Sequence, residues 1–548
     1  MPVKIIIAQQ NETLRSIAAL HHCDVQLLLA ANPHISDLDR KITKSKVYIP
    51  SSPTNIRQYP PECKPQMPDQ YLDAWIPTTP VEKMATEEYD ALIVGSGAGG
   101  STALYRLCQN WKNKNKKIGM IEAGGLLLPT HAQNVSTLEV ERFQQYFLNP
   151  KISTPVGWEL PQFSGARLVF ALGGRTLFWS AVCPRMNEVE FNENDWPIAY
   201  KDLVGYYNRV EEILRISQDF TKDSLINDIL LERLRQNGFP QSIDTPIAVD
   251  ISQSKFGKVN SDVFFSSIDF LARALNLSPF DLGIFSRAVK VIVENNKAAG
   301  VKVLTWGGKE YTIRAKNIIL SASTLETPRI LLNSGIEGKA IGHYLVNHSF
   351  LEVDGTLNRL EFPENMGNLG ILIPQAEKGP YQFQMYGRGG VFFYHERRIP
   401  LQNEIPFYLQ GFGKVEPRVE NRVTLQPTKK DQFGIPKINI NYSYSQNDYR
   451  LINLIRDDML KILKVINGRI KSESDICLRP PGLDFHEMGT CRMGNDPETS
   501  VTNKYGQVHH ISGLFVADNS VLRYSGGANP TFTMMALAFQ TADYIARK

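Results

Sequence analysis

Residues 90–101 read DALIVGSGAGGS, and this stretch decides the fold of the chain. Its apolar run, ALIV, has the length and composition of a buried strand. The run leads into Gly95-x-Gly97-x-x-Gly100, after which we expect a helix over residues 101–109. Glycines allow a tight turn and a close approach of the backbone to a pyrophosphate, and a helix N-terminus supplies N–H donors. The stretch therefore predicts a strand–turn–helix unit that binds a dinucleotide.

A second strand follows at the distance that such a unit requires. Residues 118–121 read IGMI and end at Glu122, which lies 22 residues after Gly100. A carboxylate at this distance is expected to bind the ribose of the dinucleotide. The alternative is a glycine-rich turn in an ordinary α/β unit, in which Glu122 is a surface charge.

Length and composition narrow the class of protein. A chain of 548 residues is expected to hold more than one domain. Its 60 Lys and Arg residues against 56 acidic residues give a net charge of +4, which carries no nucleic-acid signal. No run approaches the roughly 20 apolar residues of a membrane helix, and the N-terminus has too short an apolar run for a secretory signal. The six cysteines show no metal-ligand spacing. We therefore expect a cytoplasmic protein with no membrane, nucleic-acid or metal partner.

Residues 1–52 form a small unit of their own. We expect a strand at 3–7, helices that begin after Thr13 and Asp24, and a strand at 46–50. This β-α-α-β order, with the segments NETLRSIA, LLLAANPHI and VYIP, resembles a LysM module. The resemblance implies contact with polymers of N-acetylglucosamine, such as chitin or peptidoglycan. The glycine–aspartate turn that is usual in that family is Asn11-Glu12 here, so a module that only packs on the rest of the protein is the alternative.

The remaining chain alternates between strand and helix patterns after a proline-rich linker. Residues 53–88 hold seven prolines between Pro53 and Pro80, and Tyr71 and Trp75 are candidate anchors for this linker. Further expected elements are a three-stranded meander, a buried strand, a strand-rich region and an amphipathic helix, at 289–313, 317–320, 347–442 and 451–465.

Five separated segments together resemble the glucose–methanol–choline (GMC) flavin oxidoreductases. They are the glycine loop with Glu122, LGGRTLFWS (172–180), SASTLETPRILLNSGI (321–336), HEMGTCRMG (486–494), and GLFVADNSV (513–521) with GANPTFTMMALA (527–538). The resemblance covers residues 89–548. It implies an α/β fold: a Rossmann-like FAD-binding domain (89–345 and 475–548) with an interleaved α+β substrate domain built on a large mixed or antiparallel sheet (346–474). Part of 185–280 then belongs to the substrate or cap region, and the small βααβ module precedes both.

The resemblance assigns the cofactor site position by position. It implies that FAD binds with its pyrophosphate at Gly95, Gly97 and Gly100 and its adenosine ribose at Glu122. The other implied cofactor contacts are Gly174, Arg175 and Thr176 along the pyrophosphate and isoalloxazine, Val289 at the adenine, Asp518 near the ribityl chain, and Asn529 and Thr531 at the pyrimidine edge of the flavin. Phe178 stands before Trp179, where pyranose oxidases carry the histidine that can bond covalently to FAD, so we expect non-covalent FAD.

The same resemblance makes His486 the catalytic histidine and Asn529, 43 residues later, its partner. Neutral imidazole is a suitable base for a substrate hydroxyl near neutral pH, and the flavin takes the hydride. Asn529 cannot take a proton, but its amide can orient the substrate. The alternative is a polar residue at a strand end for His486 and a turn residue for Asn529. Among the remaining histidines, two are expected to be structural (His343, His348) and five to lie at the surface (His21, His22, His395, His509, His510).

The substrate that we expect is a sugar or glycoside. The segment 420–440 and the LGGRTLFWS block are similar to those of sugar-oxidising members, and aromatic rings that can stack on a sugar stand at Tyr386, Phe392, Phe393 and Tyr394. The electron acceptor is then O2 or a quinone-type molecule. One alternative is oxidation of a non-sugar alcohol or polyol by the same family chemistry. The other is a glycan-binding protein that acts through the LysM-like module.

Overall fold

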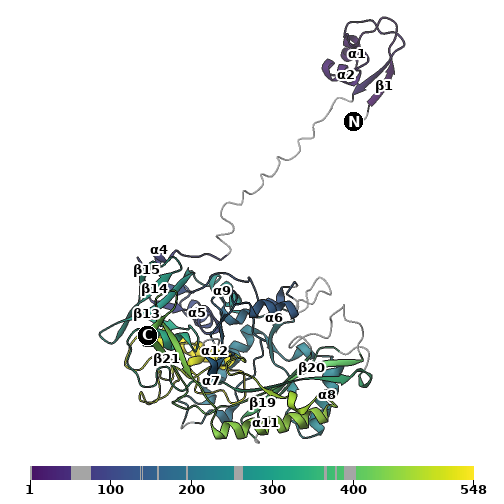
Figure 1. The fold of residues 1–548 in the computed structure, drawn as a ribbon. Helices are drawn as coiled ribbons and strands as arrows, with labels where there is room; N and C mark the ends of the chain where they lie inside the picture. Colours follow the sequence, from purple (N-terminus) through teal and green to yellow (C-terminus); the bar gives the residue numbers. More distant parts are fainter. Residues whose placement is uncertain are drawn as a thin grey trace. The chain divides into compact units, whose positions relative to one another are not determined.

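The computed structural model describes residues 3–50, 76–135, 137–138, 140–156, 160–192, 195–251, 263–362, 367–376, 379–387 and 403–548. The chain divides into two compact units, residues 1–71 and 72–548, each with its own hydrophobic core (Figure 1). Tyr71, Trp75, Phe392, Phe393, Tyr394 and His395, for which roles were expected, lie outside the described residues.

The N-terminal unit has the predicted β-α-α-β order. Its elements are β1 (Val3–Ile7), α1 (Leu14–Leu20), α2 (Val25–Ala31) and β2 (Lys46–Pro50), and β1 pairs antiparallel with β2. Thr13 caps α1 in a capping box with Ser16, and the Asp24 carboxylate accepts from the N–H groups of Gln26 and Leu27 in the first turn of α2. Leu14, Ile17, Leu28 and Val47 are fully buried between the helices and the strand pair.

The larger unit is built around a five-stranded parallel sheet. The strand order is β12 (Asp281–Gly283), β5 (Ile118–Ile121), β4 (Ala91–Val94), β16 (Ile318–Leu320) and β24 (Leu514–Val516). Every neighbouring pair is parallel. The strands β4, β5, β16 and β24 are buried at each residue, as expected for a parallel sheet covered on both faces. Their sequences are accordingly apolar runs rather than alternating patterns.

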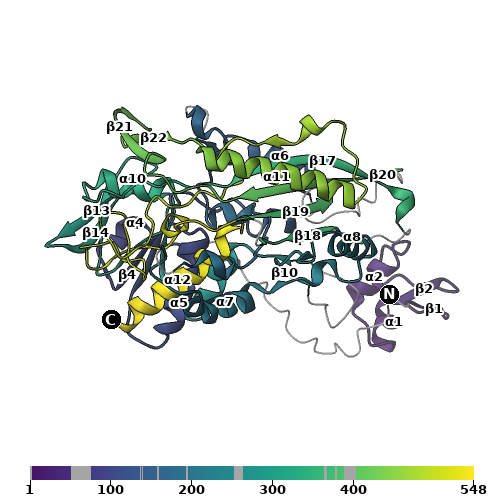
Figure 2. The same cartoon turned by 90° about the horizontal axis from the view of Figure 1, so that it is seen from below.

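Helices cover this sheet and build the main core. Among them, α5 packs on α12 and α9, and α12 also packs on α7 (Figures 1 and 2). Their bounds are α5 (Ala98–Asn110), α7 (Tyr200–Leu214), α9 (Ser267–Leu275) and α12 (Pro530–Arg547). The helix expected to begin at Ser101 begins three residues earlier, at Ala98, because Gly99 and Gly100 already belong to it. The loop and the helix N-terminus are thus one structure.

The predicted meander is confirmed as part of a second sheet. Its order is β13 (Ser286–Glu294), β14 (Lys297–Thr305), β15 (Glu310–Ala315) and β3 (Glu88–Tyr89). The end of the segment expected to be linker forms a short helix instead, α4 (Val81–Met84). Thr79 just before it donates its N–H to the Leu282 carbonyl at 2.8 Å and its hydroxyl to Asp281 at 2.9 Å.

A six-stranded antiparallel sheet forms the other side of the larger unit. Its order is β23 (Cys477–Leu478), β17 (Ser349–Asn358), β20 (Glu404–Gly413), β19 (Tyr381–Gly387), β18 (Gly370–Ile373) and β9 (Ile243–Asp244). Helix α11 (Gln446–Val465) packs across β17 and β20 (Figure 2), and α8 (Leu225–Gln236) packs beside β18 and β9. The start of α11 was predicted five residues too late, because the capping box of Ser445 and Asp448 was overlooked.

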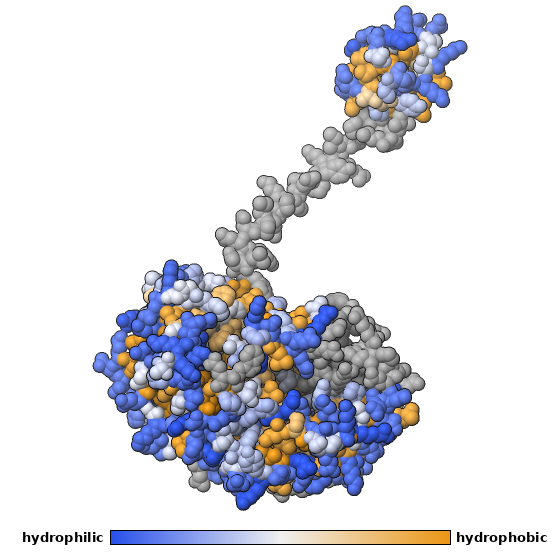
Figure 3. All heavy atoms as spheres, in the orientation of Figure 1, coloured by the Kyte–Doolittle hydropathy of each residue, from blue (hydrophilic) through white to orange (hydrophobic). Residues whose placement is uncertain are grey.

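Shorter elements complete the larger unit: α6 (Val140–Leu148), α10 (Glu326–Asn333), β6 (Thr154–Pro155), β7 (Arg167–Leu168), β8 (Ile216–Ser217), β10 (Ile247–Asp250), β11 (Val263–Phe264), β21 (Arg422–Lys430), β22 (Pro436–Asn441), and the 3-10 turn η4 (Gly174–Leu177). Hydrophilic residues dominate the face of this unit seen in Figure 3, and apolar residues occur there in small groups. Among the described helices, none has both the length and the apolar character needed to cross a bilayer.

Candidate active site

A cavity of about 800 Å³ lies between the two large sheets. One side is formed at the carboxyl ends of β4, β5 and β16, where ligands bind in open parallel sheets. The opposite side is formed by residues of the antiparallel sheet, including Gln384 of β19 and Tyr408, Gln410 and Phe412 of β20. Such a volume lies in the range of cofactor sites.

The glycine loop fits a pyrophosphate, and each glycine is required for a different reason. Gly95 has φ +98°, and a Cβ there would lie 2.4 Å from the Ser321 carbonyl oxygen. A Cβ at Gly100 would lie 1.9 Å from the Gly95 carbonyl oxygen, so this glycine allows the helix to approach the loop. Gly97 lines the cavity, and no described atom lies within 4 Å of its Cβ position. No described side chain caps α5, so its first N–H groups are left for a ligand.

Glu122 lies in the same cavity and is not a surface charge. Its residue is only 6% exposed, and its carboxylate accepts from the N–H and hydroxyl of Ser96 at 2.9 and 2.7 Å and from the N–H of Gly124 at 2.9 Å. Burial raises the pKa of this carboxyl. The hydrogen bonds hold it at the end of β5, beside the glycine loop and in the cavity lining.

The second glycine-rich block packs against the first. Gly174 has φ +56°, and a Cβ there would lie 3.3 Å from Gly97 Cα. Thr176 donates to the Gly173 carbonyl at 2.6 Å and accepts from the Ser267 N–H at 2.9 Å, which fixes the turn η4. Arg175 pairs with Glu487 at 2.9 Å. Gly174, Arg175 and Thr176 all line the cavity.

The C-terminal candidates reach the same cavity from two further segments. Asp518 lines it, is 5% exposed, and accepts from the N–H of Ser323 at 3.1 Å and from the hydroxyl of Thr327 at 2.5 Å. Burial raises the pKa of its carboxyl. Thr531 lines the cavity from the first turn of α12, and Asn529 occupies the N-cap position of that helix.

His486 and Asn529 meet inside the cavity. Their Nε2 and Nδ2 atoms lie 3.3 Å apart, although 43 residues separate them in the chain. The Asn529 carbonyl oxygen accepts from Gln382 Nε2 at 3.0 Å and from Gln384 Nε2 at 2.6 Å. Neither glutamine was predicted as a site residue. The two alternate along β19 (QFQMY) and so share one face of the sheet. Tyr386 continues this face and donates its hydroxyl to Gln384.

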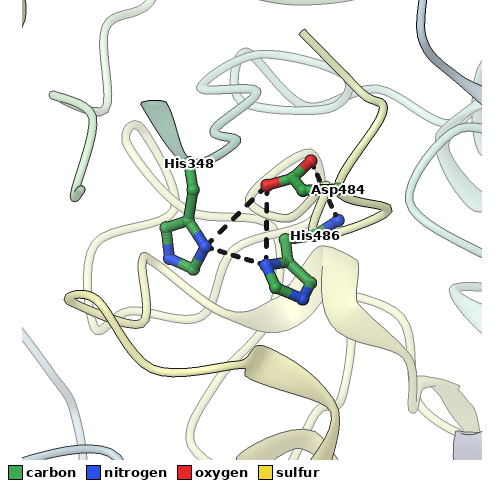
Figure 4. A group of neighbouring side chains, drawn as sticks. All are labelled: His348, Asp484 and His486. Carbon is green, nitrogen blue, oxygen red and sulfur yellow. Dashed lines mark hydrogen bonds and ion pairs between the residues drawn. The ribbon is translucent and has the colours of Figure 1, made fainter. Parts of the chain in front are cut away.

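His348, which was expected to be structural, is buried behind His486 and contacts its ring, although it does not line the cavity itself. Its Nδ1 lies 2.9 Å from His486 Nδ1, and Asp484 faces both rings (Figure 4). Burial lowers the pKa of His348 to about 4 and the pKa of His486 well below its usual value. Burial and the neighbouring Glu487 raise the pKa of Asp484 to about 7. His343 by contrast lies outside the described lining and contacts the Val419 carbonyl at 2.9 Å.

Two of the predicted cofactor residues lie beside the cavity rather than in its described lining. Gly100 supports the loop from behind, as described above. Val289 is 7% exposed, and its carbonyl accepts from Asn333 Nδ2 at 2.8 Å, while its neighbour Ala288 lines the cavity. Phe178 also lines the cavity and packs on Phe147, with ring centroids 5.2 Å apart.

The glycine loop and the histidine–asparagine pair share one cavity, an arrangement that suits a dinucleotide-binding oxidoreductase. Family profiles described as GMC oxidoreductase match residues 89–350 and 417–538. The chain therefore belongs to the GMC oxidoreductases. It is an FAD-dependent enzyme that oxidises alcohol groups.

Known relatives differ in the alcohol that they oxidise. The chain is 26% identical to a 2-methyl-1,2-propanediol dehydrogenase of Mycolicibacterium austroafricanum, over 85% of this chain and 96% of the relative. It is 28% identical to a C-glycoside 3-oxidase of Arthrobacter globiformis, over 69% of this chain and 74% of the relative. A formate oxidase variant of Aspergillus oryzae RIB40 has a similar fold, with a TM-score of 0.63 at 17% identity, over 84% of this chain and 98% of that one.

Proposed function

We propose that the enzyme oxidises a hydroxyl of a sugar or glycoside to a carbonyl, with His486 as the general base. The observation that carries this proposal is the 3.3 Å contact between His486 Nε2 and Asn529 Nδ2 in the cavity that also contains the glycine loop. Both side chains thus face a substrate placed beside a cofactor that is held at the other end of the same cavity.

In the proposed reaction, the substrate hydroxyl gives its proton to His486 Nε2, so that the O–H bond breaks and an N–H bond forms. Bound FAD supplies the acceptor for the hydride that leaves the carbon bearing this hydroxyl. Asn529 donates from Nδ2 to the substrate oxygen, because its carbonyl oxygen is already occupied by Gln382 and Gln384. The amide therefore orients the oxygen and stabilises the negative charge that develops on it.

We assign the cofactor contacts to the cavity-lining residues and their supports. Gly95, Gly97 and Gly100 form the pyrophosphate loop, and Glu122 binds the ribose. The remaining contacts are assigned to Gly174, Arg175, Thr176, Val289, Asp518, Asn529 and Thr531. Phe178 offers no nucleophile beside the cavity, so FAD is held without a covalent bond.

The lining supports a substrate with several hydroxyls. Gln384, Tyr386, Tyr408 and Gln410 bring amides and phenols to the side of the cavity formed by the antiparallel sheet. Such groups exchange hydrogen bonds with a polyhydroxylated ring, and the C-glycoside 3-oxidase relative acts on one. The diol dehydrogenase relative favours a second candidate, a non-sugar alcohol or polyol. O2 or a quinone-type acceptor then reoxidises the enzyme.

A substrate panel separates these candidates. The holoenzyme is mixed anaerobically with glucose, a C-glycoside or 2-methyl-1,2-propanediol, and flavin absorbance near 450 nm is followed. Bleaching by the sugars, but not by the diol, is the expected result. If only the diol bleaches the flavin, the substrate is a non-sugar alcohol or polyol, and the sugar proposal is wrong. Repeating the reaction in air and with a quinone dye identifies the acceptor.

We further propose the domain roles. Residues 89–345 and 475–548 bind FAD, 346–474 bind substrate, and part of 185–280 contributes a cap. Residues 1–52 are proposed as a LysM-like module that contacts a glycan, joined by the linker 53–88. The support for this module is its β-α-α-β order and its separate core.

A further inference from the structure

A continuous chain of hydrogen bonds connects Ser525, His348, His486 and Asn529. The donor and the acceptor can be assigned first at Ser525. Ser525 Oγ lies 2.7 Å from the Ala528 carbonyl oxygen and 3.1 Å from His348 Nε2. A carbonyl oxygen only accepts, so the single hydroxyl proton of Ser525 is used there. The contact with His348 therefore requires that His348 Nε2 carries a proton and donates it to Ser525.

The donor at His348 Nε2 also fixes which nitrogen carries the proton in both imidazoles. A neutral His348 that is protonated on Nε2 has a lone pair on Nδ1, which lies 2.9 Å from His486 Nδ1. His486 must then carry its proton on Nδ1 and donate it to His348. Its Nε2 is left with a lone pair, which accepts from Asn529 Nδ2 at 3.3 Å. Burial keeps both rings neutral by lowering their pKa values.

The chain ends with the same direction at the substrate side. Asn529 can donate from Nδ2 because Gln382 and Gln384 both donate to its carbonyl oxygen. Every link from the glutamines of β19 to the Ala528 carbonyl thus has one consistent donor and acceptor. A flip of His486 to the other tautomer would place two N–H groups, or two lone pairs, against each other at one contact or more.

Asp484 stands beside the link between the two histidines. Its side chain is 0% exposed, and its Oδ2 lies 3.5 Å from His486 Nδ1 and 3.9 Å from His348 Nδ1 (Figure 4). The Asn347 side chain hydrogen-bonds this carboxyl, and Oδ1 lies 3.4 Å from the His486 backbone nitrogen, which leaves Oδ2 without a close hydrogen-bond partner among the described residues. A buried carboxylate in this position has its free oxygen directed at the ring that becomes positive when it takes a proton.

Resting on the proposed role of His486, we propose that Ser525 and His348 are positioning residues that hold its proton on Nδ1, and that Asp484 is the counter-charge for the imidazolium. When Nε2 takes the substrate proton, the ring gains one positive charge, and the Asp484 carboxylate balances it inside the protein. The Nδ1–H then strengthens its contact with Asp484 and His348. No net charge is created in the buried site, which lowers the cost of the proton transfer.

Other charged and titratable groups face the cluster of His348, Asp484 and His486. They are Arg175, Glu487, Tyr442 and Tyr444. Burial raises the pKa of both tyrosines, so they stay neutral. Asp484, with its pKa raised to about 7, is the group that loses its charge as the pH falls through neutrality. We expect kcat/KM of the wild-type enzyme to fall below about pH 7 for this reason.

The tautomer is tested with two substitutions at one position. His348→Leu removes the acceptor of the His486 Nδ1 proton, and we expect kcat to fall about a hundredfold with little change in KM. His348→Asn places an amide oxygen where the imidazole Nδ1 stands, so it should recover most of the lost rate. Equal kcat for Leu, Asn and wild type would overturn the positioning role. If His348→Leu fails to bind FAD, His348→Asn at wild-type kcat supports the role, and His348→Asn at a kcat reduced a hundredfold overturns it.

The counter-charge is tested by the pH profile of Asp484→Asn. This variant keeps the shape of the side chain and removes its charge, so kcat/KM should drop at least about tenfold at pH 8 and become nearly flat between pH 6 and 8. Asp458→Asn is the matched control, because Asp458 is a buried aspartate on α11 bonded to Tyr381 and Lys461, away from the described cavity lining. It should keep the wild-type profile. An Asp484→Asn profile that retains the fall below pH 7 refutes the counter-charge.

His486→Ala separates failure of this inference from failure of the proposed function. Full turnover by His486→Ala would show that His486 is not the base, and the positioning roles of Ser525 and His348 would fail with it. Loss of turnover by His486→Ala, together with wild-type kinetics for the His348 and Asp484 variants, leaves the base standing and overturns the inference alone. A stoichiometric metal ion whose chelation abolishes activity would also overturn it, since a metal would then occupy the lone pairs that the hydrogen bonds require.

Discussion

At the scale of single residues, the cavity sets the chemistry of His486 by keeping it uncharged. Imidazole in water is half protonated near pH 6.5, whereas burial lowers the pKa of His486 well below this value. A neutral ring is ready to accept a proton over the whole physiological pH range. The cost is that the imidazolium is poorly tolerated, so the groups around the ring must stabilise it during the reaction.

The first prediction concerns His486 itself. His486→Ala should lower kcat by at least about a hundredfold, the usual contribution of a general base, while FAD stays bound. Stopped-flow reduction of the flavin measures the rate, and the flavin-to-protein absorbance ratio measures retention. His343→Ala is the control, because the His343 ring is hydrogen-bonded to the Val419 carbonyl and lies outside the described lining. Turnover that survives in His486→Ala would remove this residue from the role of base.

The second prediction concerns Phe178 and the attachment of FAD. Phenylalanine cannot form a bond to the flavin, and His131 nearby is fully buried with its Nε2 2.8 Å from the Trp179 carbonyl. Acid precipitation of the holoenzyme should therefore release the yellow colour into the supernatant. Absorbance spectra of supernatant and pellet check this. Flavin that remains with the washed pellet would show a covalent bond from another side chain.

Residues that contact each other across the site could be predicted only where a local motif marks them. His486 stands in HEMGTCRMG and was found, whereas His348 lies 138 residues before it and has no comparable motif of its own. Gln382 and Gln384 meet Asn529 only because β19 pairs with β20 in one register. Register depends on the whole antiparallel sheet, so no short segment contains this information.

At the scale of elements, two glycines at the start of α5 serve different purposes: Gly97 leaves space for a ligand, and Gly100 allows the chain to pack. Gly97 has φ −66°, which any residue can adopt, and its Cβ position is open to the cavity. Gly100 is packed against the Gly95 carbonyl, where an added Cβ would lie at 1.9 Å. A glycine is therefore needed at Gly97 to leave space for a ligand, and at Gly100 to leave space for the backbone of the loop.

The third prediction uses this difference. Gly97→Ala should leave the Tm of the FAD-free protein within about 1 °C of wild type, because the backbone is compatible, but should loosen FAD. Gly100→Ala should lower the Tm by a few degrees, because overpacking costs about 1–3 kcal/mol. Thermal unfolding with and without added FAD measures both. Equal Tm losses for the two variants in the absence of FAD would contradict the assignment.

Elements with a strong local pattern were predicted well, and their ends were not. The parallel strands are short apolar runs, and the strands of the meander β13–β15 coincide with three predicted runs. The helix α11 was recognised by its apolar stripe, but its first turn is polar and is defined by the Ser445 cap. A cap depends on one or two hydrogen bonds, which contribute little to a periodic pattern.

At the scale of the whole molecule, two sheets with different patterns build one cavity. The parallel sheet supplies the cofactor side through its carboxyl ends, and the antiparallel sheet supplies Gln384, Tyr408 and Gln410. His486 and Asn529, from the C-terminal segments, line the same cavity. The sequence predicted the strands β4, β5 and β16 and a strand-rich region over 347–442, but the cavity follows only from the packing of the two sheets, which joins segments hundreds of residues apart.

The fourth prediction concerns the two units of the chain. The cavity and both large sheets lie in residues 72–548, and residues 1–50 have a core of their own. A chain of residues 72–548 should therefore keep the kcat, the KM and the main thermal transition of the full chain. If the small unit binds glycan, only the full chain will sediment with chitin or peptidoglycan. Sedimentation of both chains, or of neither, contradicts a glycan role for this unit, while a loss of kcat on truncation would show that catalysis depends on it.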